Sequence, residues 1–115
     1  MIRIGTRGSA LALAQAELVA AALDAEVQVV PITTSGDRDE ALGDKSRWTS
    51  ALERALLAGE IDIAVHSAKD VPGELADGTV IAAIPARASA LDALCGFADL
   101  ASIAPGARVG TSSIR

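Results

Sequence analysis

The chain has 115 residues, of which 50% are hydrophobic, 22% charged and 2% aromatic, and its formal net charge is −5. This length suits one domain of ordinary size, and the hydrophobic content excludes a disordered chain. The excess of acidic side chains argues against a general nucleic-acid binder, and the one cysteine, Cys95, can form neither an internal disulfide nor a metal cage.

Targeting and membrane segments are not indicated by the pattern. Residues 1–4 run directly into a strand-like sequence, without the apolar region of a signal peptide. The longest apolar tract, residues 10–25, contains Gln15, Glu17 and Asp24 and is too short to span a bilayer, so we expect a buried amphipathic helix. We therefore expect a cytoplasmic protein with no membrane partner.

The first half of the chain alternates between strand and helix patterns. Residues 2–6 predict a strand, and Ser9 is a suitable N-cap for a helix over residues 10–24. On that helix five apolar residues share one face by their spacing: Leu11, Ala14, Leu18, Ala21 and Ala22. Residues 27–33 predict a second strand that Pro31 interrupts.

A polar stretch over residues 34–47 is too long for a tight connection and is expected to be functional or mobile. Residues 50–53 have the spacing of a capping box and predict a helix that Gly59 ends. Residues 61–65 and 80–84 predict two more strands. This order predicts an α/β fold, a mostly parallel sheet with flanking helices, which binds ligands at the carboxyl ends of its strands.

The pattern changes after residue 85. Residues 91–97 resemble a strand, residues 98–103 a short helix and residues 108–110 the start of a strand. Residues 111–113 resemble the N-cap of a further helix, and the sequence stops at Arg115. We therefore expect a truncated chain, with a first α/β domain at 1–85 and the opening segment of a second at 86–115.

Two segments have the composition of anion sites. Residues 6–9 lie between the first strand and its helix, where Arg7 and the Ser9 hydroxyl join the unpaired N–H groups of a helix N-terminus. The alternative is that Ser9 only caps the helix and Arg7 is solvated. Residues 111–115 repeat the arrangement, and two such sites suggest a ligand with more than one carboxylate or phosphate.

The most informative segment is residues 66–72, because it follows the third predicted strand at the carboxyl edge of the sheet. Asp70 beside Lys69 can bind an anion and stabilise a developing cation together. The alternatives are a solvated Lys69, an Asp70 that caps a turn before Pro72, and a partly buried His66 without a chemical role.

Five segments, in order along the chain, resemble the porphobilinogen deaminase (hydroxymethylbilane synthase) family. They are residues 4–15 (IGTRGSALALAQ), 34–37 (TSGD), 51–57 (ALERALL), 62–72 (DIAVHSAKDVP) and 110–115 (GTSSIR). The resemblance implies an enzyme that joins four porphobilinogen molecules head to tail into hydroxymethylbilane, with release of ammonia, in tetrapyrrole biosynthesis. It also implies three domains, the first two like periplasmic binding proteins, and a dipyrromethane cofactor on a cysteine of the third.

The resemblance also assigns roles to residues. It makes Asp70 the catalytic carboxylate, which contacts pyrrole N–H groups and stabilises the azafulvenium cation left when ammonia departs. Cations and hydroxyls would hold the carboxylates of cofactor and substrate or support the cofactor pocket: Arg7, Ser9, Lys45, Ser67, Lys69, Thr111, Ser112, Ser113 and Arg115. Cys95 does not match the attachment cysteine, which this chain lacks.

The chain departs from the family pattern in two places. The glycine-rich loop with a following Leu-Phe reads here as residues 43–48 (GDKSRW), and residues 87–92 lack an acidic-Pro-Arg triplet. We expect the complete enzyme to be monomeric and the 115-residue chain to be inactive alone and prone to self-association. The alternative function is a non-catalytic anion-binding module of the periplasmic-binding-protein type.

Overall fold

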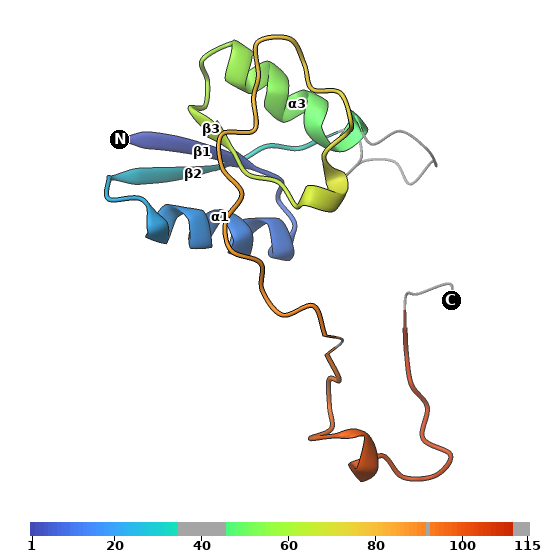
Figure 1. Ribbon diagram of the computed structural model, residues 1–115. Helices are drawn as coiled ribbons and strands as arrows, with labels where there is room; N and C mark the ends of the chain where they lie inside the picture. Colours follow the sequence, from blue (N-terminus) through green and yellow to red (C-terminus); the bar gives the residue numbers. More distant parts are fainter. Residues whose placement is uncertain (35–45, 92, 112–115) are drawn as a thin grey trace. The chain divides into compact units, whose positions relative to one another are not determined.

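The computed structural model describes residues 1–34, 46–91 and 93–111 (Figure 1). It divides the chain into two units, Met1–Pro85 and Ala86–Arg115. In the part of the first unit that the structure describes, there are a parallel sheet and two α-helices. Among the described residues, no helix is long and apolar enough to cross a membrane.

The sheet has three strands, β1 (Ile2–Thr6), β2 (Val27–Pro31) and β3 (Ile63–Ala64), in the order β2-β1-β3. Both pairings are parallel, and Ile4 of β1 lies opposite Val29 on one side and Ile63 on the other. Backbone hydrogen bonds extend the β3 pairing, from Asp62 N–H to the Arg3 carbonyl and from Val65 N–H to the Gly5 carbonyl, both at 2.9 Å. The predicted parallel sheet is therefore confirmed.

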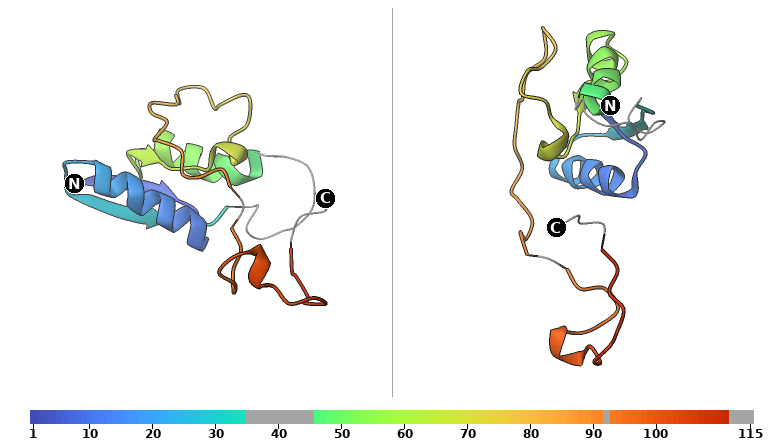
Figure 2. Two further views of the ribbon diagram at one scale, coloured as in Figure 1. Left: turned by 60° about the horizontal axis from the view of Figure 1, so that its bottom comes forward. Right: turned by 90° about the vertical axis from the view of Figure 1, so that its right-hand side faces the viewer.

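The two helices lie on opposite faces of this sheet (Figures 1 and 2). The first, α1 (Ala10–Ala22), packs against β1 and β2, and the second, α3 (Ser46–Leu57), packs against β3 and β1. The core between these layers contains five fully or almost fully buried apolar residues: Ile4, Ala16, Leu52, Ala55 and Ile61. These layers confirm the predicted α/β class.

Helix α1 begins where the sequence predicts, because the Ser9 hydroxyl accepts a hydrogen bond from Ala12 N–H at 3.3 Å. It ends at Ala22, two residues before the predicted end. The expectation of a buried helix was wrong for the apolar face that the spacing defines: its residues Leu11, Ala14, Leu18, Ala21 and Ala22 are exposed, whereas Ala16 is buried. Almost every position of α1 is apolar, so spacing alone does not identify the face that packs.

Helix α3 begins at Ser46, four residues before the predicted start at Ser50. The capping-box spacing was misleading because Ser50 lies inside the helix, where its carbonyl accepts a hydrogen bond from Arg54 Nε at 3.3 Å. The predicted end is correct. Gly59 has a φ of +68°, and two hydrogen bonds typical of a Schellman motif, Gly59 N–H to Leu56 and Glu60 N–H to Ala55, close the helix.

The chain after β3 forms a short 3-10 helix, η1 (Ala68–Asp70), and then an irregular segment up to residue 85. The predicted fourth strand at residues 80–84 was wrong, because no neighbouring strand pairs with it in the described part of the chain. Val80 and Ile84 are 80% and 84% exposed. β-branched residues favour an extended chain, but a strand also needs a pairing partner and a buried face.

Within residues 86–91 and 93–111, the second unit has one regular element, the 3-10 helix η2 (Leu100–Ser102), which lies within the predicted helix at residues 98–103. Asp99 caps it, with Oδ1 accepting from Ser102 N–H at 2.8 Å. The strands predicted at residues 91–97 and 108–110 do not form in the described residues, and Leu91 and Val109 are exposed. Their apolar residues lack a paired neighbour, as in residues 80–84.

Candidate functional site

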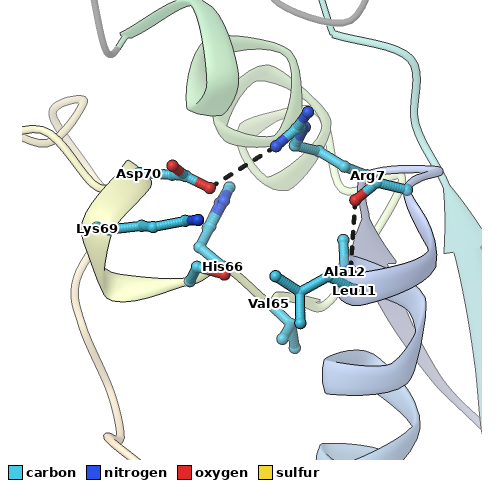
Figure 3. A pocket seen from close by; sticks show the side chains of 9 residues that line it. Arg7, Leu11, Ala12, Val65, His66, Lys69 and Asp70 are labelled. Atoms are coloured by element: carbon cyan, nitrogen blue, oxygen red, sulfur yellow. Dashed lines mark hydrogen bonds and ion pairs between the residues drawn. The ribbon is translucent and has the colours of Figure 1, made fainter. Parts of the chain in front are cut away.

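The sheet order places the carboxyl ends of β1 and β3 side by side, at the point where the order of strands reverses. From there the chain leads from β1 to α1 and from β3 to η1. Such a switch point is where open α/β sheets form a ligand crevice. A pocket of about 210 Å³ lies there (Figure 3), lined by Arg7, Ser9, Leu11, Ala12, Val65, His66, Ser67, Lys69 and Asp70.

One wall of the pocket is the turn from β1 into α1. The buried Thr6 fixes this turn, because its hydroxyl donates to the Ala12 carbonyl at 3.1 Å. The Ser9 cap adds a second contact across the same turn. Arg7 lies between these two anchors, and its guanidinium reaches into the pocket with a side chain that is only 19% exposed.

The opposite wall is η1 and the residues before it. Asp70 N–H donates to the Ser67 carbonyl at 2.9 Å, and this bond closes the short turn. The Ser67 hydroxyl donates to Gln15 Oε1 at 2.8 Å, which ties the turn to α1. The turn therefore presents Lys69 and Asp70 side by side toward Arg7 (Figure 3).

The two walls meet in an ion pair between Arg7 Nη1 and Asp70 Oδ2, which are 3.7 Å apart. Asp70 Oδ1 accepts no hydrogen bond from the residues that the structure describes. The pocket thus contains two cationic groups, Arg7 and Lys69, and one carboxylate. This arrangement can bind a ligand that has both an anionic group and a hydrogen-bond donor.

His66 lies behind this pair, with its ring directed toward Arg7 and Asp70 (Figure 3). Burial lowers the pKa of its imidazole below the ordinary value, and the positive charge of Arg7 acts in the same direction. The carboxylates of Glu53 and Asp70 oppose this lowering of the pKa.

The structure brings five of the predicted site residues together, namely Arg7, Ser9, Ser67, Lys69 and Asp70. Thr111 lies in the second unit. Four others, Lys45, Ser112, Ser113 and Arg115, lie outside the described residues. The described residues contain no group of three or more His, Cys, Asp or Glu side chains that could hold a metal ion.

Comparison with known proteins gives the same family as the sequence motifs. Residues 2–115 match the family model described as porphobilinogen deaminase, dipyromethane cofactor binding domain. The chain belongs to the porphobilinogen deaminase family. It is 46% identical to the porphobilinogen deaminase of Deinococcus radiodurans and 45% identical to that of Caulobacter sp., each over 99% of this chain. It is also 44% identical to a probable porphobilinogen deaminase of Thermoplasma volcanium.

The match covers only part of these relatives. The chain spans 42% of the length of the Deinococcus and Caulobacter proteins and 41% of the Thermoplasma protein. The resemblance that the five sequence segments indicated is confirmed at the level of the family.

Two residues around the pocket were not singled out from the sequence. Gln15 accepts the hydrogen bond from Ser67, and Glu53 of α3 acts on His66. Both belong to segments that carried the resemblance, but their types and spacing do not distinguish them from surface residues. Only the packing of α1 and α3 on opposite faces of the sheet brings them to the same loop.

Proposed function

We propose that this chain forms one wall of the active site of a porphobilinogen deaminase. That enzyme joins four porphobilinogen molecules head to tail into hydroxymethylbilane, with one ammonia released for each. The observation that carries the proposal is the ion pair of Arg7 and Asp70 at the switch point of the sheet, beside Lys69. Membership in the family supports the same reaction.

The cationic groups suit the acidic side of this substrate. Porphobilinogen carries an acetate and a propionate group, and Arg7 offers a planar fork of N–H donors for one such carboxylate. Lys69 supplies a second positive charge at the pocket, and Ser9 and Ser67 also line it. The family resemblance alone implies that Lys45, Thr111, Ser112, Ser113 and Arg115 also take part in binding the carboxylates of cofactor and substrate.

Asp70 suits the other requirement of the reaction. When the protonated amino group of porphobilinogen departs as ammonia, the carbon–nitrogen bond breaks, its electron pair leaves with nitrogen, and an azafulvenium cation remains. A carboxylate held beside the ring accepts the pyrrole N–H and stabilises the positive charge as it develops. The open Oδ1 of Asp70 provides that acceptor while Oδ2 faces Arg7.

The pocket residues also fit the dipyrromethane cofactor, whose carboxylates need fixed cations and whose pyrrole N–H groups need an acceptor. Arg7 and Lys69 would hold the carboxylates, and Asp70 would accept from the N–H groups. When bound, this cofactor supplies the rings from which the product chain grows. Cys95 is the only cysteine and does not match the attachment residue. The intact mass of the purified 115-residue chain is therefore expected to show no dipyrromethane adduct. For the same reason, an activity assay of this chain is expected to show no consumption of porphobilinogen.

A non-catalytic anion-binding module is the alternative function. Asp70 disfavours it, because a site that only binds anions does not need a carboxylate beside Arg7 and Lys69. The proposed enzyme is cytoplasmic and monomeric, with porphobilinogen as its small-molecule partner and neither nucleic acid nor membrane as a partner.

The proposal is tested by titrating the labelled 115-residue chain with porphobilinogen and following its ¹H–¹⁵N amide signals. We expect shifts at Arg7, Ser67, Lys69 and Asp70, and an affinity about 10- to 100-fold weaker in Arg7→Leu, because a charge-assisted hydrogen bond is lost. Arg87→Leu, which removes an exposed arginine of the second unit, is the matched control and should bind as the parent does. Shifts confined to residues outside the pocket would contradict the proposal.

A further inference from the structure

The turn that presents Lys69 and Asp70 has little of its own to hold it in place. Helix η1 is three residues long, and none of the three is buried. Two backbone hydrogen bonds, Asp70 N–H to Ser67 and Val71 N–H to Ala68, are its internal support. A 3-10 turn has poorer hydrogen-bond geometry than an α-helix, so contacts from outside contribute to holding this one in place.

Besides the ion pair of Asp70 with Arg7, one outside contact precedes the turn and another follows it. Before the turn, Ser67 donates to Gln15 of α1. After it, Ala76 N–H donates to Glu53 Oε1 of α3 at 3.3 Å. The half-buried carboxylate of Glu53 thus reaches from the opposite helix to the backbone that follows Asp70.

The segment around Ala76 is itself an ordered turn. The Ala76 carbonyl accepts from Thr79 N–H at 3.0 Å and from the Thr79 hydroxyl at 2.7 Å, which closes a tight turn. Gly78 in this turn has a φ of +89° and lies against Leu57 of α3. A bond to Ala76 therefore anchors a structured turn on α3.

Glu53 also acts on the pocket through its charge. Its carboxylate and that of Asp70 both favour the protonated form of His66, whereas burial and Arg7 favour the neutral form. His66 lines the pocket beside Asp70. Glu53 is thus linked to the segment after Asp70 by its hydrogen bond with Ala76 and to the pocket by its charge interaction with His66.

We propose that Glu53 is a positioning residue, which holds the Lys69–Asp70 turn at the pocket from α3 while Gln15 holds it from α1. The functional meaning of this role rests on the proposed function, but the tethering itself does not. Glu53 contacts no residue of the substrate pocket by a hydrogen bond in the described structure, so its effect on Asp70 passes through the Ala76 segment and His66.

The test is NMR on the 115-residue chain without any ligand, using Glu53→Ala, Glu53→Gln and the control Glu60→Gln. Glu60 is an exposed carboxylate just after α3. In Glu53→Ala we expect the Ala76 amide to exchange about tenfold or more faster and the Lys69 and Asp70 amide signals to shift. Glu53→Gln should restore slow exchange, because its side-chain oxygen still accepts from Ala76 N–H.

A second readout separates positioning from plain structural support. The pKa of His66 should fall in Glu53→Gln, because one of the two carboxylates that favour imidazolium has lost its charge. Glu60→Gln should leave it unchanged. Unchanged Ala76 exchange in Glu53→Ala would overturn the proposal. If the alanine variant does not fold, an unchanged Ala76 amide-proton shift in Glu53→Gln, where a neutral oxygen replaces the carboxylate acceptor, would overturn it. Neither the amide exchange nor the His66 pKa measurement needs porphobilinogen. Their outcome therefore does not depend on whether the proposed function is correct.

Discussion

Arg7 and Asp70 form an ion pair at the carboxyl ends of β1 and β3, with Nη1 and Oδ2 3.7 Å apart. This distance exceeds the 2.7–2.9 Å typical of a charge-assisted hydrogen bond, so the pair is weak enough for a ligand to replace. A ligand carboxylate on Arg7 would leave Asp70 available to a pyrrole N–H.

The cap of α1 and the serine inside α3 give a matched pair of substitutions. Ser9→Ala should destabilise the chain by about 1 kcal/mol, because Ala12 N–H loses its side-chain acceptor. Ser50→Ala should cost nothing or stabilise slightly, since alanine is the better residue inside a helix. Denaturant unfolding of both variants checks this. A larger loss in Ser50→Ala would show that the helix begins at Ser50 after all.

At Gly5 of β1, the side chains of Ile61 and Ile32 leave no room for a Cβ atom. A Cβ at Gly5 would collide with the Cδ1 atom of the buried Ile61, and it would also come within 3.4 Å of Ile32. Gly5→Ala should therefore cost about 1–3 kcal/mol of unfolding free energy. Gly8→Ala is the control, because nothing lies within 4 Å of the added atom. Equal stability of the two variants by thermal unfolding would contradict the β1–Ile61 packing.

Arg3 and Asp62 join β1 to the start of β3 and should give a stability that depends on pH. Arg3 Nε and Nη2 donate to the two Asp62 oxygens at 3.0 and 2.8 Å, and this hydrogen bonding lowers the pKa of Asp62 from 3.8 to about 2.

A carboxyl with a lowered folded-state pKa stabilises the fold above its unfolded pKa, and this stability is lost as the pH falls through the folded value. Asp62→Asn should therefore melt below the parent at neutral pH, and the difference should close between pH 3.8 and about 2. Asp77→Asn, at an exposed carboxylate, is the control. A difference that persists unchanged at the acidic end would rule out the ion pair as its source.

The sequence predicted those parts of the fold that depend on local pattern. The Ser9 cap, the Gly59 end and the strands at β1 and β2 follow from residue type and spacing, and the structure has them. It did not predict the packed face of α1, because an Ala-rich helix is apolar all round. Nor did it show that residues 80–84 stay unpaired, because pairing depends on neighbours far away in sequence.

Part of the candidate site could likewise be predicted from the sequence, and part could not. Arg7, Ser9, Ser67, Lys69 and Asp70 were identified from their positions after predicted strands, and the parallel sheet brings them to one pocket. The supporting contacts of Gln15 and Glu53 needed the structure, since each joins residues more than twenty positions apart.

The central claim, that Asp70 stabilises the cation formed from porphobilinogen, is tested most directly by turnover of a chimera. In it, this chain replaces the matching 42% of the Deinococcus radiodurans porphobilinogen deaminase. The chimera should consume porphobilinogen, and Asp70→Asn should lower the rate by about 10²- to 10³-fold with the fold intact, because a preorganised charge is removed. Asp24→Asn, an exposed carboxylate beyond α1, should have no effect. Turnover by Asp70→Asn near that of the parent chimera would contradict the account.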